Sequence, residues 1–250
     1  MKILLALQFW EGDKDSGMDL ARLIADLHPS MSTEADFLFM ARHDCLNDFP
    51  TVEYVSRKFK THHAVARRRG EGWPFGTTQL WLSVLDWVYA LPSRSKEYEA
   101  VFTFEPDACP LTPGWISAVK HGWERVNKKV YGAYLENPEP HINGNAMYSC
   151  DRDFLEFITR KHRGVPPKAA WDTFLAPDFK RYGWANSPEM RSWWSCKNFL
   201  PSQGDALLSQ GVHFLHGVKT DQVRYFVSLK NGLVFHTRLA PITCGMAQSG

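Results

Sequence analysis

The sequence predicts an α/β fold in which a mainly parallel central sheet is flanked by helices. The first observation is that short apolar runs, rich in β-forming residues, alternate with helix-like segments over residues 1–162. The second is that 44% of the 250 residues are hydrophobic and many are aromatic, as in a folded protein with a substantial core. Strands that alternate with helices build parallel sheets, because each helix returns the chain to the start of the next strand.

The predicted elements follow one another through this region. Apolar runs indicate strands at 2–9, 35–40, 100–104, 130–135 and 142–149. Runs with helical periodicity indicate helices at 18–27 and 151–161, a helix that begins at about 78, and a further helix from 113 to about 126. The helix from about 78 is apolar on nearly every side, so we expect it to be buried. Thr112 followed by Pro113 is typical of a helix N-terminus, because threonine caps free amides and proline fits the first turn.

The segment after about residue 163 lacks this alternation and is rich in Trp and Pro. It shows no internal repeat, no low-complexity tract and no obvious linker. We therefore expect one domain over 1–250, in which an α/β ligand-binding part at 1–162 is completed by an irregular part at 163–250.

Charge, hydropathy and cysteine content narrow the class of protein. The 29 basic residues nearly balance the 27 acidic ones, so net charge indicates no partner. The apolar run at the N-terminus is short and acids follow it at once, which favours a first strand over a signal peptide. No stretch is long enough to span a membrane. A cytoplasmic protein without a zinc module or disulfide framework is expected, because no C-x-x-C pair occurs among Cys45, Cys109, Cys150, Cys196 and Cys244.

Two acidic residues, Glu105 and Asp107, follow directly on the expected strand 100–104, with Pro106 stiffening the backbone between them. Open α/β sheets bind ligands beyond the carboxyl ends of their strands, which is where these acids would lie. Carboxylates together with substrate phosphates are ligands that Mg²⁺ or Mn²⁺ prefers. Alone, the pair is more typical of solvated acids, which are common at strand ends.

Three later segments add polar residues that suit the same crevice. In "HINGNAMY" the glycine permits close backbone approach and the two amides bond hydroxyls, although N-G is also a common turn. In "WDTFLAPDF" an aspartate is a candidate general base, or else a helix cap. In "HGVK" the imidazole is a candidate metal ligand and the amine a candidate phosphate contact, or else both are structural. The residues concerned are Asn143, Gly144, Asn145, Asp172, His216 and Lys219.

This succession of motifs resembles a GT-A-type glycosyltransferase over roughly residues 1–220. The resemblance implies that Glu105 and Asp107 hold Mn²⁺ or Mg²⁺ against the donor diphosphate, and that His216 adds a ligand. It further implies that Lys219 contacts phosphate and that Asp172 deprotonates the acceptor hydroxyl, as in inverting enzymes. The sequence departs from the common D-x-D motif in its first acid and its proline. Glu105 is therefore expected on the metal or, alternatively, on the sugar or ribose.

The resemblance also implies a donor site for a nucleoside-diphosphate sugar, which we take to be a UDP-sugar. The nucleotide base is expected at the end of the first strand, where Phe9 or Trp10 stacks on it unless both are core residues. The loop 72–76, ending in Gly76, is expected to face the donor, with a plain turn as the alternative. Asn143, Gly144 and Asn145 are expected to contact the same ligand.

The most uneven charge lies between residues 57 and 69. Six basic residues gather there: Arg57, Lys58, Lys60, Arg67, Arg68 and Arg69. A basic stripe beside an active-site crevice suits contact with a phosphate backbone, although charge runs are also typical of solvated faces. A second surface with Trp184, Trp193 and Trp194 would stack on bases or sugars, or pack in the core.

Compact GT-A-like enzymes of this kind resemble bacteriophage-type transferases that glycosylate hydroxymethylated bases in DNA. The resemblance implies a hydroxymethylated pyrimidine as acceptor, flipped out of the duplex to reach the crevice, and a host cytoplasm as the location. A glycosyltransferase acting on a cell-surface saccharide is the alternative enzyme, and it predicts no salt-sensitive DNA binding. A non-catalytic nucleic-acid or glycan-binding module on the same scaffold is the other alternative, and it predicts no turnover of nucleotide sugars.

Overall fold

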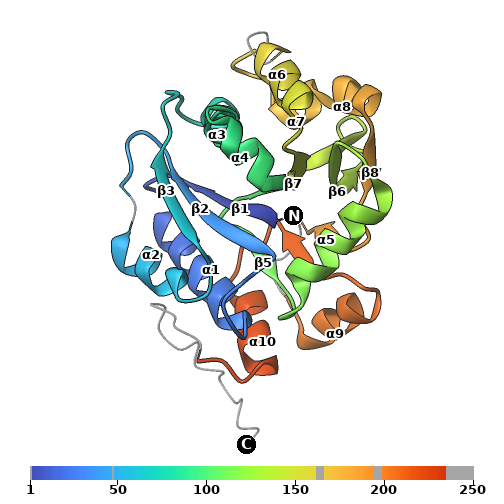
Figure 1. Ribbon diagram of the computed structural model, residues 1–250. Helices are drawn as coiled ribbons and strands as arrows, with labels where there is room; N and C mark the ends of the chain where they lie inside the picture. Colours follow the sequence, from blue (N-terminus) through green and yellow to red (C-terminus); the bar gives the residue numbers. More distant parts are fainter. Residues whose placement is uncertain (1, 47, 162–165, 194–198, 235–250) are drawn as a thin grey trace, which may run out of the picture.

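The computed structural model describes residues 2–46, 48–161, 166–193 and 199–234, and its centre is a seven-stranded sheet (Figure 1). All strands but β7 run in one direction, because β7 pairs antiparallel with β4 and β6 while the other pairs are parallel. The predicted α/β fold with a mainly parallel sheet is therefore confirmed. In spatial order the strands are β3 (Thr61–Val65), β2 (Ala35–Ala41), β1 (Lys2–Phe9), β4 (Tyr98–Phe104), β7 (His141–Ser149), β6 (Val130–Leu135) and β8 (Trp184–Asn186).

Helices cover both faces of this sheet, because successive side chains of a strand point to opposite sides. Leu5 and Leu7 of β1 pack into one core, whereas Leu4 and Ala6 pack into the other. The first core is closed by α1 (Lys14–Leu27), α2 (Phe49–Ser56) and α5 (Trp115–Val126). The second is closed by α3 (Phe75–Tyr89), α6 (Arg152–Lys161), α7 (Trp171–Phe174) and α8 (Ala176–Tyr182), with the short α4 (Pro92–Glu97) beside α3. As expected from its sequence, α3 is largely buried.

A second, three-stranded sheet brings the far end of the chain back to the tip of β4. Its order is β5 (Ala108–Pro110), β10 (Phe214–His216) and β9 (Met190–Ser192). β10 runs antiparallel to β5 in a register that pairs His216 with Ala108, so His216 arrives next to Asp107. A third apolar cluster beneath this sheet is closed by α9 (Pro201–Ser209) and α10 (Gln222–Lys230).

The structure differs from the sequence-based expectation in three places. The region after 163 is not irregular where it is described, because it contributes β8 to the central sheet as well as β9, β10 and several helices. Its strands have three residues each, which is too short for an alternation of polar and apolar residues to be recognised. The strand β3 was also not expected. Thr112 does not cap α5, since its hydroxyl lies 3.0 Å from His213 Nδ1 and the helix begins at Trp115.

Two simpler expectations concern membrane spans and cysteines. No helix within the described ranges combines the length and the apolar character that crossing a bilayer requires. Within the described residues Cys45, Cys109 and Cys150 are buried and form no disulfide, while Cys196 and Cys244 lie outside the described residues.

Candidate active site

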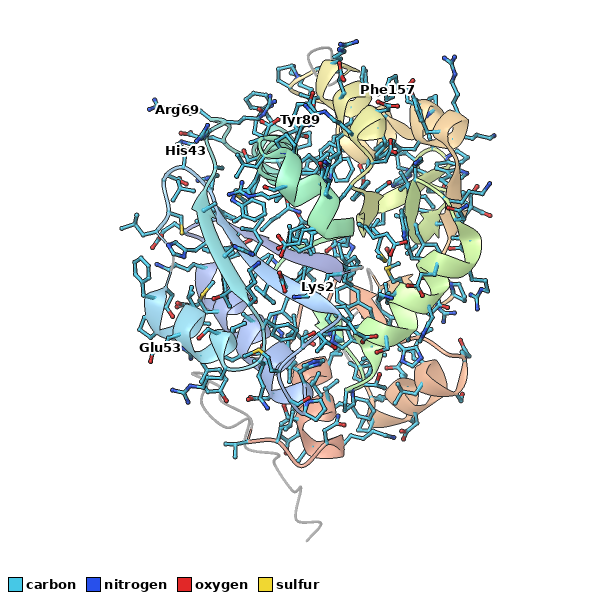
Figure 2. The ribbon with its side chains drawn as sticks, viewed as in Figure 1. Lys2, His43, Glu53, Arg69, Tyr89 and Phe157 are labelled. Carbon is cyan, nitrogen blue, oxygen red and sulfur yellow. The ribbon has the colours of Figure 1, made fainter. Side chains whose placement is uncertain are left out.

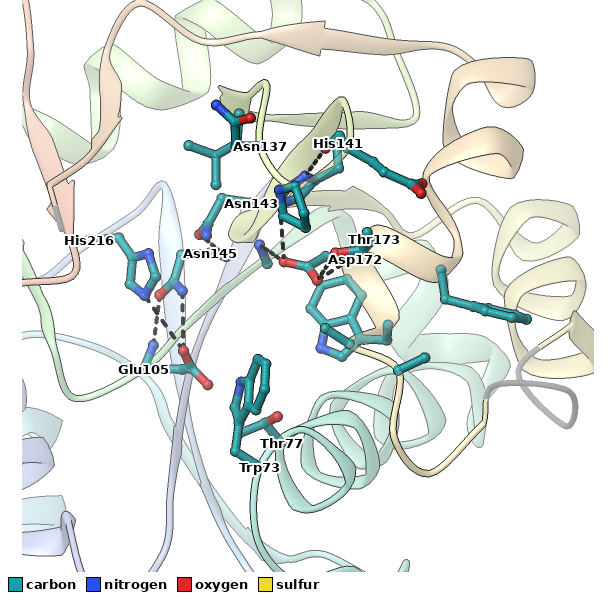
Figure 3. Close-up of a pocket in the computed structure, with 18 of the residues that line it drawn as sticks. Trp73, Thr77, Glu105, Asn137, His141, Asn143, Asn145, Asp172, Thr173 and His216 are labelled. Carbon is teal, nitrogen blue, oxygen red and sulfur yellow. Dashed lines mark hydrogen bonds and ion pairs between the residues drawn. The ribbon is translucent and has the colours of Figure 1, made fainter.

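Two carboxylates and an imidazole converge at the carboxyl end of β4. The possible ligand atoms of Glu105, Asp107 and His216 all lie within 4.8 Å of one another. His216 Nε2 is 3.2 Å from Asp107 Oδ1. It is 3.6 Å from Glu105 Oε2, a contact that Figure 3 shows. The structure thus brings together the three residues that the sequence suggested as metal ligands, although they come from segments about a hundred residues apart.

Backbone pairing between β4 and β7 explains the orientation of Glu105. Thr103 pairs with Ala146, so Asn145 of β7 lies beside the residue that follows β4. The Glu105 amide donates to Asn145 Oδ1 at 2.9 Å, and Asn145 Nδ2 lies 3.5 Å from Glu105 Oε2. The Asn145 side chain therefore contacts both the backbone amide and the carboxylate of Glu105. It is not directed at a ligand alone.

The electrostatics of the three-residue cluster suit a cation. Burial alone would lower the pKa of His216, but hydrogen bonding and charge from Asp107 and Glu105 outweigh it and raise that pKa to about 9. Burial alone would raise the pKa of Asp107, but His216 and Lys219, whose amine bonds Asp107 Oδ2, hold it well below its usual range. In the described structure Asp107 Oδ1 is buried without a hydrogen bond of good geometry. Two carboxylates and one imidazole nitrogen form a donor set that fits Mn²⁺ or Mg²⁺.

A third acid, Asp13, lies within electrostatic reach of this cluster. Its pKa is raised to about 6, first by burial and then by the negative charges of Glu105 and Asp107, while a hydrogen bond from the Trp10 amide (2.8 Å) opposes the shift. Asp13 was not among the residues expected from the sequence, because nothing in its surroundings marks it apart from the other acids at 11–15.

A cavity of about 710 Å³ opens beside Glu105, Asp107 and His216, which we call the metal-ligand cluster. Glu105 and His216 lie at one side of it and Asp172 at another, with Trp73 projecting from below (Figure 3). Among the described residues that line it there is no lysine or arginine, whereas three carboxylates are present: Glu105, Glu139 and Asp172. The titratable groups of this lining are therefore three carboxylates and the imidazoles of His141 and His216.

Asp172 lies in the first turn of α7 and is not the cap of that helix, because Ala170 occupies the capping position. The Gly144 amide donates to Asp172 Oδ2 at 3.2 Å, and the Thr173 amide donates to Oδ1 at 2.9 Å. Burial raises the pKa of Asp172, while the nearby His141 opposes that rise. A largely buried carboxylate, 17% exposed in its side chain, with a raised pKa at the edge of a cavity is a candidate general base.

His141 was placed at the start of a strand by the sequence but was given no role in the site. Its Nδ1 lies 2.6 Å from the Glu139 carbonyl oxygen, so Nδ1 donates, and its Nε2 lies 3.9 Å from Asp172 Oδ2. His141, Asn143 and Asn145 stand two residues apart on β7 and therefore share one face of the strand. This period of two in "HINGN" is the signal that would have identified His141.

Several predicted donor contacts lie elsewhere. Phe9 is 1% exposed in the core, whereas Gln8 lines the cavity, because neighbouring residues of a strand face opposite ways. Phe9 therefore has no free face for a nucleotide base. Trp10 is 44% exposed, and the Arg42 guanidinium lies 4.9 Å from its ring centroid. Gly76 is buried in α3 and does not line the cavity; the residues of that segment that do are Trp73 and Thr77.

Gly144 has a different role from the one expected. A Cβ at this position would lie 2.7 Å from Trp171 Cζ2, so the glycine makes room for a tryptophan side chain. That ring is stacked on Trp81 at 3.8 Å between centroids, with 7° between the planes. Gly144 does line the cavity, but the close approach is to the helix that carries Asp172. Lys219 likewise does not line the cavity, and its amine contacts Asp107.

The six basic residues do not form one stripe. Residues 57–60 precede β3 and residues 67–69 follow it. The two groups therefore lie at opposite ends of this strand, which is about 16 Å long for its five residues. Figure 2 shows Arg69 where β2 and β3 end, far from Lys2 at the start of β1. Several are paired, since Lys60 Nζ lies 2.7 Å from Glu97 Oε1 and Arg68 Nε lies 2.6 Å from Asp86 Oδ2.

The tryptophans proposed as a second surface are not arranged as one. Trp184 is partly buried in β8 against the second core, and Trp193 is partly buried against the third apolar cluster. Trp194 lies outside the described residues. Core packing, the alternative that the sequence left open, accounts for Trp184 and Trp193.

Comparison with known proteins relates this architecture to glycosyltransferases. No family model matches the sequence, and no curated protein matches it. WbbM, a bifunctional glycosyltransferase, matches with a TM-score of 0.53 and 10% identity over 88% of this chain and 46% of that one. S. aureus TarS and mouse xyloside xylosyltransferase 1 each have a TM-score of 0.49 and 10% identity, over 91% and 86% of this chain and 38% and 97% of theirs. This chain thus spans less than half of WbbM and of TarS. Its fold is similar to that of WbbM, a match with a TM-score above 0.5.

Proposed function

We propose that this protein is a metal-dependent glycosyltransferase that moves a sugar from a nucleoside-diphosphate sugar, such as a UDP-sugar, to an acceptor hydroxyl. One observation carries the proposal: Glu105 and His216, two members of a cluster suited to a cation, line the same cavity as Asp172, a largely buried carboxylate with a raised pKa. Sugar transfer needs both functions, because the diphosphate leaves with negative charge and the attacking hydroxyl must lose a proton.

Glu105, Asp107 and His216 would hold Mn²⁺ or Mg²⁺ in this enzyme. When bound, the divalent ion supplies positive charge that stabilises the departing diphosphate. Asn145 keeps Glu105 oriented toward that position through the two contacts described above. Lys219, whose side chain is largely exposed, would exchange its contact with Asp107 for a phosphate oxygen of the donor.

Asp172 would accept the proton of the acceptor hydroxyl. Two backbone amides fix its carboxylate, and burial keeps its pKa above that of an exposed aspartate, which makes it a stronger base. His141 would favour the ionised form by charge. The metal-ligand cluster and Asp172 lie apart along the cavity (Figure 3), which suits attack from the face opposite to the leaving group and hence inversion of the anomeric centre.

An uncharged acceptor, such as a saccharide, is our first candidate. The cavity lining within the described residues carries carboxylates and no lysine or arginine, so a polyanionic acceptor would be repelled there. A flipped-out hydroxymethylated base in DNA is the second candidate. It is favoured by Arg67 and Arg69, which are exposed at the carboxyl end of β3, on the same edge of the sheet as the cavity.

One assay tests the proposal. The protein is incubated with Mn²⁺ and a panel of nucleotide sugars, and release of nucleoside diphosphate is followed with saccharides, with hydroxymethylated DNA and with unmodified DNA. Release that depends on an acceptor and disappears in Asp107→Ala is expected. Asp205→Ala, which removes an exposed carboxylate on α9, is the matched control and should retain activity. Undiminished release in Asp107→Ala would contradict the metal assignment, and no release with any donor would favour a binding module.

A further inference from the structure

A buried arginine lies behind the two acids of the metal-ligand cluster. Arg224 belongs to α10 and is 6% exposed. Its guanidinium donates to the carbonyl oxygen of Pro106, the residue between Glu105 and Asp107. It also donates to Ser16 O and Ser16 Oγ, each at 3.1 Å. One side chain therefore joins α10 to the first turns of α1 and to the loop that carries both acids.

The hydrogen bonds that Arg224 donates to Pro106 and Ser16 all end on uncharged oxygens. A buried guanidinium is costly unless its donors are satisfied, so a fold that only needed to fill this space would use an apolar residue. The fork of an arginine can bond several oxygens in fixed directions, which a lysine amine on a flexible stem cannot reproduce. The arrangement is therefore suited to orienting the backbone that it contacts.

The bond from Arg224 to the Pro106 carbonyl oxygen is one of three hydrogen bonds to backbone carbonyl oxygens that hold the turn 105–107. The Glu105 carbonyl accepts from the Ala108 amide at 3.0 Å, and the Asp107 carbonyl accepts from the Val218 amide at 2.7 Å. With Pro106 bonded to Arg224, the carbonyls of three consecutive residues are all engaged. Because the direction of a side chain follows from its backbone, the two carboxylates can face His216 only while this turn keeps its shape.

We propose that Arg224 is a positioning residue that fixes the turn 105–107 and thereby sets the affinity of the metal-ligand cluster for a divalent cation. The identity of the ion rests on the proposed function, whereas the positioning of the turn does not. The proposal predicts that loss of the guanidinium loosens the turn even in the metal-free protein, and that metal affinity falls in consequence.

The test uses Arg224→Gln and Arg224→Lys with two readouts. Hydrogen exchange of the Ala108 and Val218 amides is measured in the metal-free protein, with the Leu5 amide of β1 reporting on global stability. Mn²⁺ affinity is measured by direct titration without substrate. In Arg224→Gln we expect the two loop amides to exchange about tenfold faster relative to Leu5, and Mn²⁺ to bind about tenfold more weakly, with Arg224→Lys between this variant and the unchanged protein.

Lys230→Gln is the matched control, because it removes a partly exposed positive charge from the same helix and should change neither readout. If Arg224→Gln does not fold, Arg224→Lys decides by the same measurements. Loop amides that exchange at the original rate, with Mn²⁺ affinity within twofold, would overturn the proposal. If the unchanged protein binds no Mn²⁺, the metal part of the proposed function fails, and the exchange rates alone decide whether Arg224 positions the turn.

Discussion

At the scale of single residues, the surroundings of each carboxylate decide what it can do. Asp172 is buried beside one imidazole and two amides, and its pKa is raised by that burial. Asp107 is held by His216 and Lys219, and its pKa is lowered. The first is suited to accept a proton and the second to remain ionised in front of a cation. In the proposed enzyme the same side-chain chemistry would thus serve two functions.

The base assignment predicts a pH profile. Because Asp172 must be ionised to act and its pKa is raised, kcat/KM should fall as the pH drops through a value above 3.8, the ordinary value for aspartate. Asp172→Asn should reduce kcat by about 10²–10⁴-fold. Binding of the nucleotide sugar, measured by calorimetry, should persist. Asp178→Asn, which removes a carboxylate outside the cavity lining, should retain activity. Loss of donor binding in Asp172→Asn would show instead that the residue is structural.

The carboxylate of Asp36, in β2, should make the stability of the fold depend on pH. Burial alone would raise the pKa of this fully buried group, but the His62 ring, 4.0 Å away, and hydrogen bonds from Lys2 and Tyr98 lower it to about 2. A lowered pKa stabilises the folded state above pH 4 and loses that effect as the pH falls from about 4 to 2. The contribution is about 2 kcal/mol. Denaturant titrations across this range should show a steeper loss in the unchanged protein than in Asp36→Asn, and equal slopes would refute the assignment.

At the scale of elements, the reversed strand β7 and the short helix α7 build one wall of the cavity together. β7 brings His141, Asn143 and Asn145 to the same face, and α7 packs against it through Trp171. The glycine at position 144 allows this approach, since any side chain there meets the indole. The position of Asp172 is therefore set by the fit between strand and helix.

Gly144→Ala tests that fit. The added methyl group would overlap Trp171, which cannot retreat because it is stacked on Trp81, so α7 and Asp172 should shift. We expect a loss of about 1–3 kcal/mol in the free energy of unfolding and a lower kcat. Gly114→Ala, where a Cβ meets nothing within 4 Å, is the control and should be neutral. A Gly144→Ala protein with unchanged kcat and stability would show that the wall adapts.

At the scale of the whole molecule, the distribution of charge bears on the acceptor. The two basic groups lie at opposite ends of β3, and the cavity lining carries acids. Transfer to an uncharged acceptor should therefore change less than about threefold between 50 and 200 mM salt, whereas binding of a DNA acceptor through Arg67 and Arg69 would weaken about tenfold. Initial rates across this range, with Arg67→Ala beside the unchanged protein, distinguish the two. A steep salt slope that weakens in Arg67→Ala would favour DNA.

The whole molecule also shows which features a sequence can predict. Glu105 and Asp107 were predictable because an apolar run of five residues ended in acids, and ligands bind where parallel strands end. The side of β1 that faces the cavity was not predictable, because it depends on which helices cover each face of the sheet. Phe9 was expected to contact the ligand, but Phe9 is in the core and its neighbour Gln8 lines the cavity. The contact of Arg224 with residues 118 and 208 positions away leaves no local pattern at all.

The pairing of β10 with β5 has a consequence for how the protein is made. The two acids leave the ribosome more than a hundred residues before His216, and the imidazole reaches them only when the small sheet closes. A chain that has folded its central sheet alone would carry the carboxylates without their third partner. A cation that needs all three ligands would bind only after the last strand docks, and would then stabilise the finished fold over every earlier intermediate.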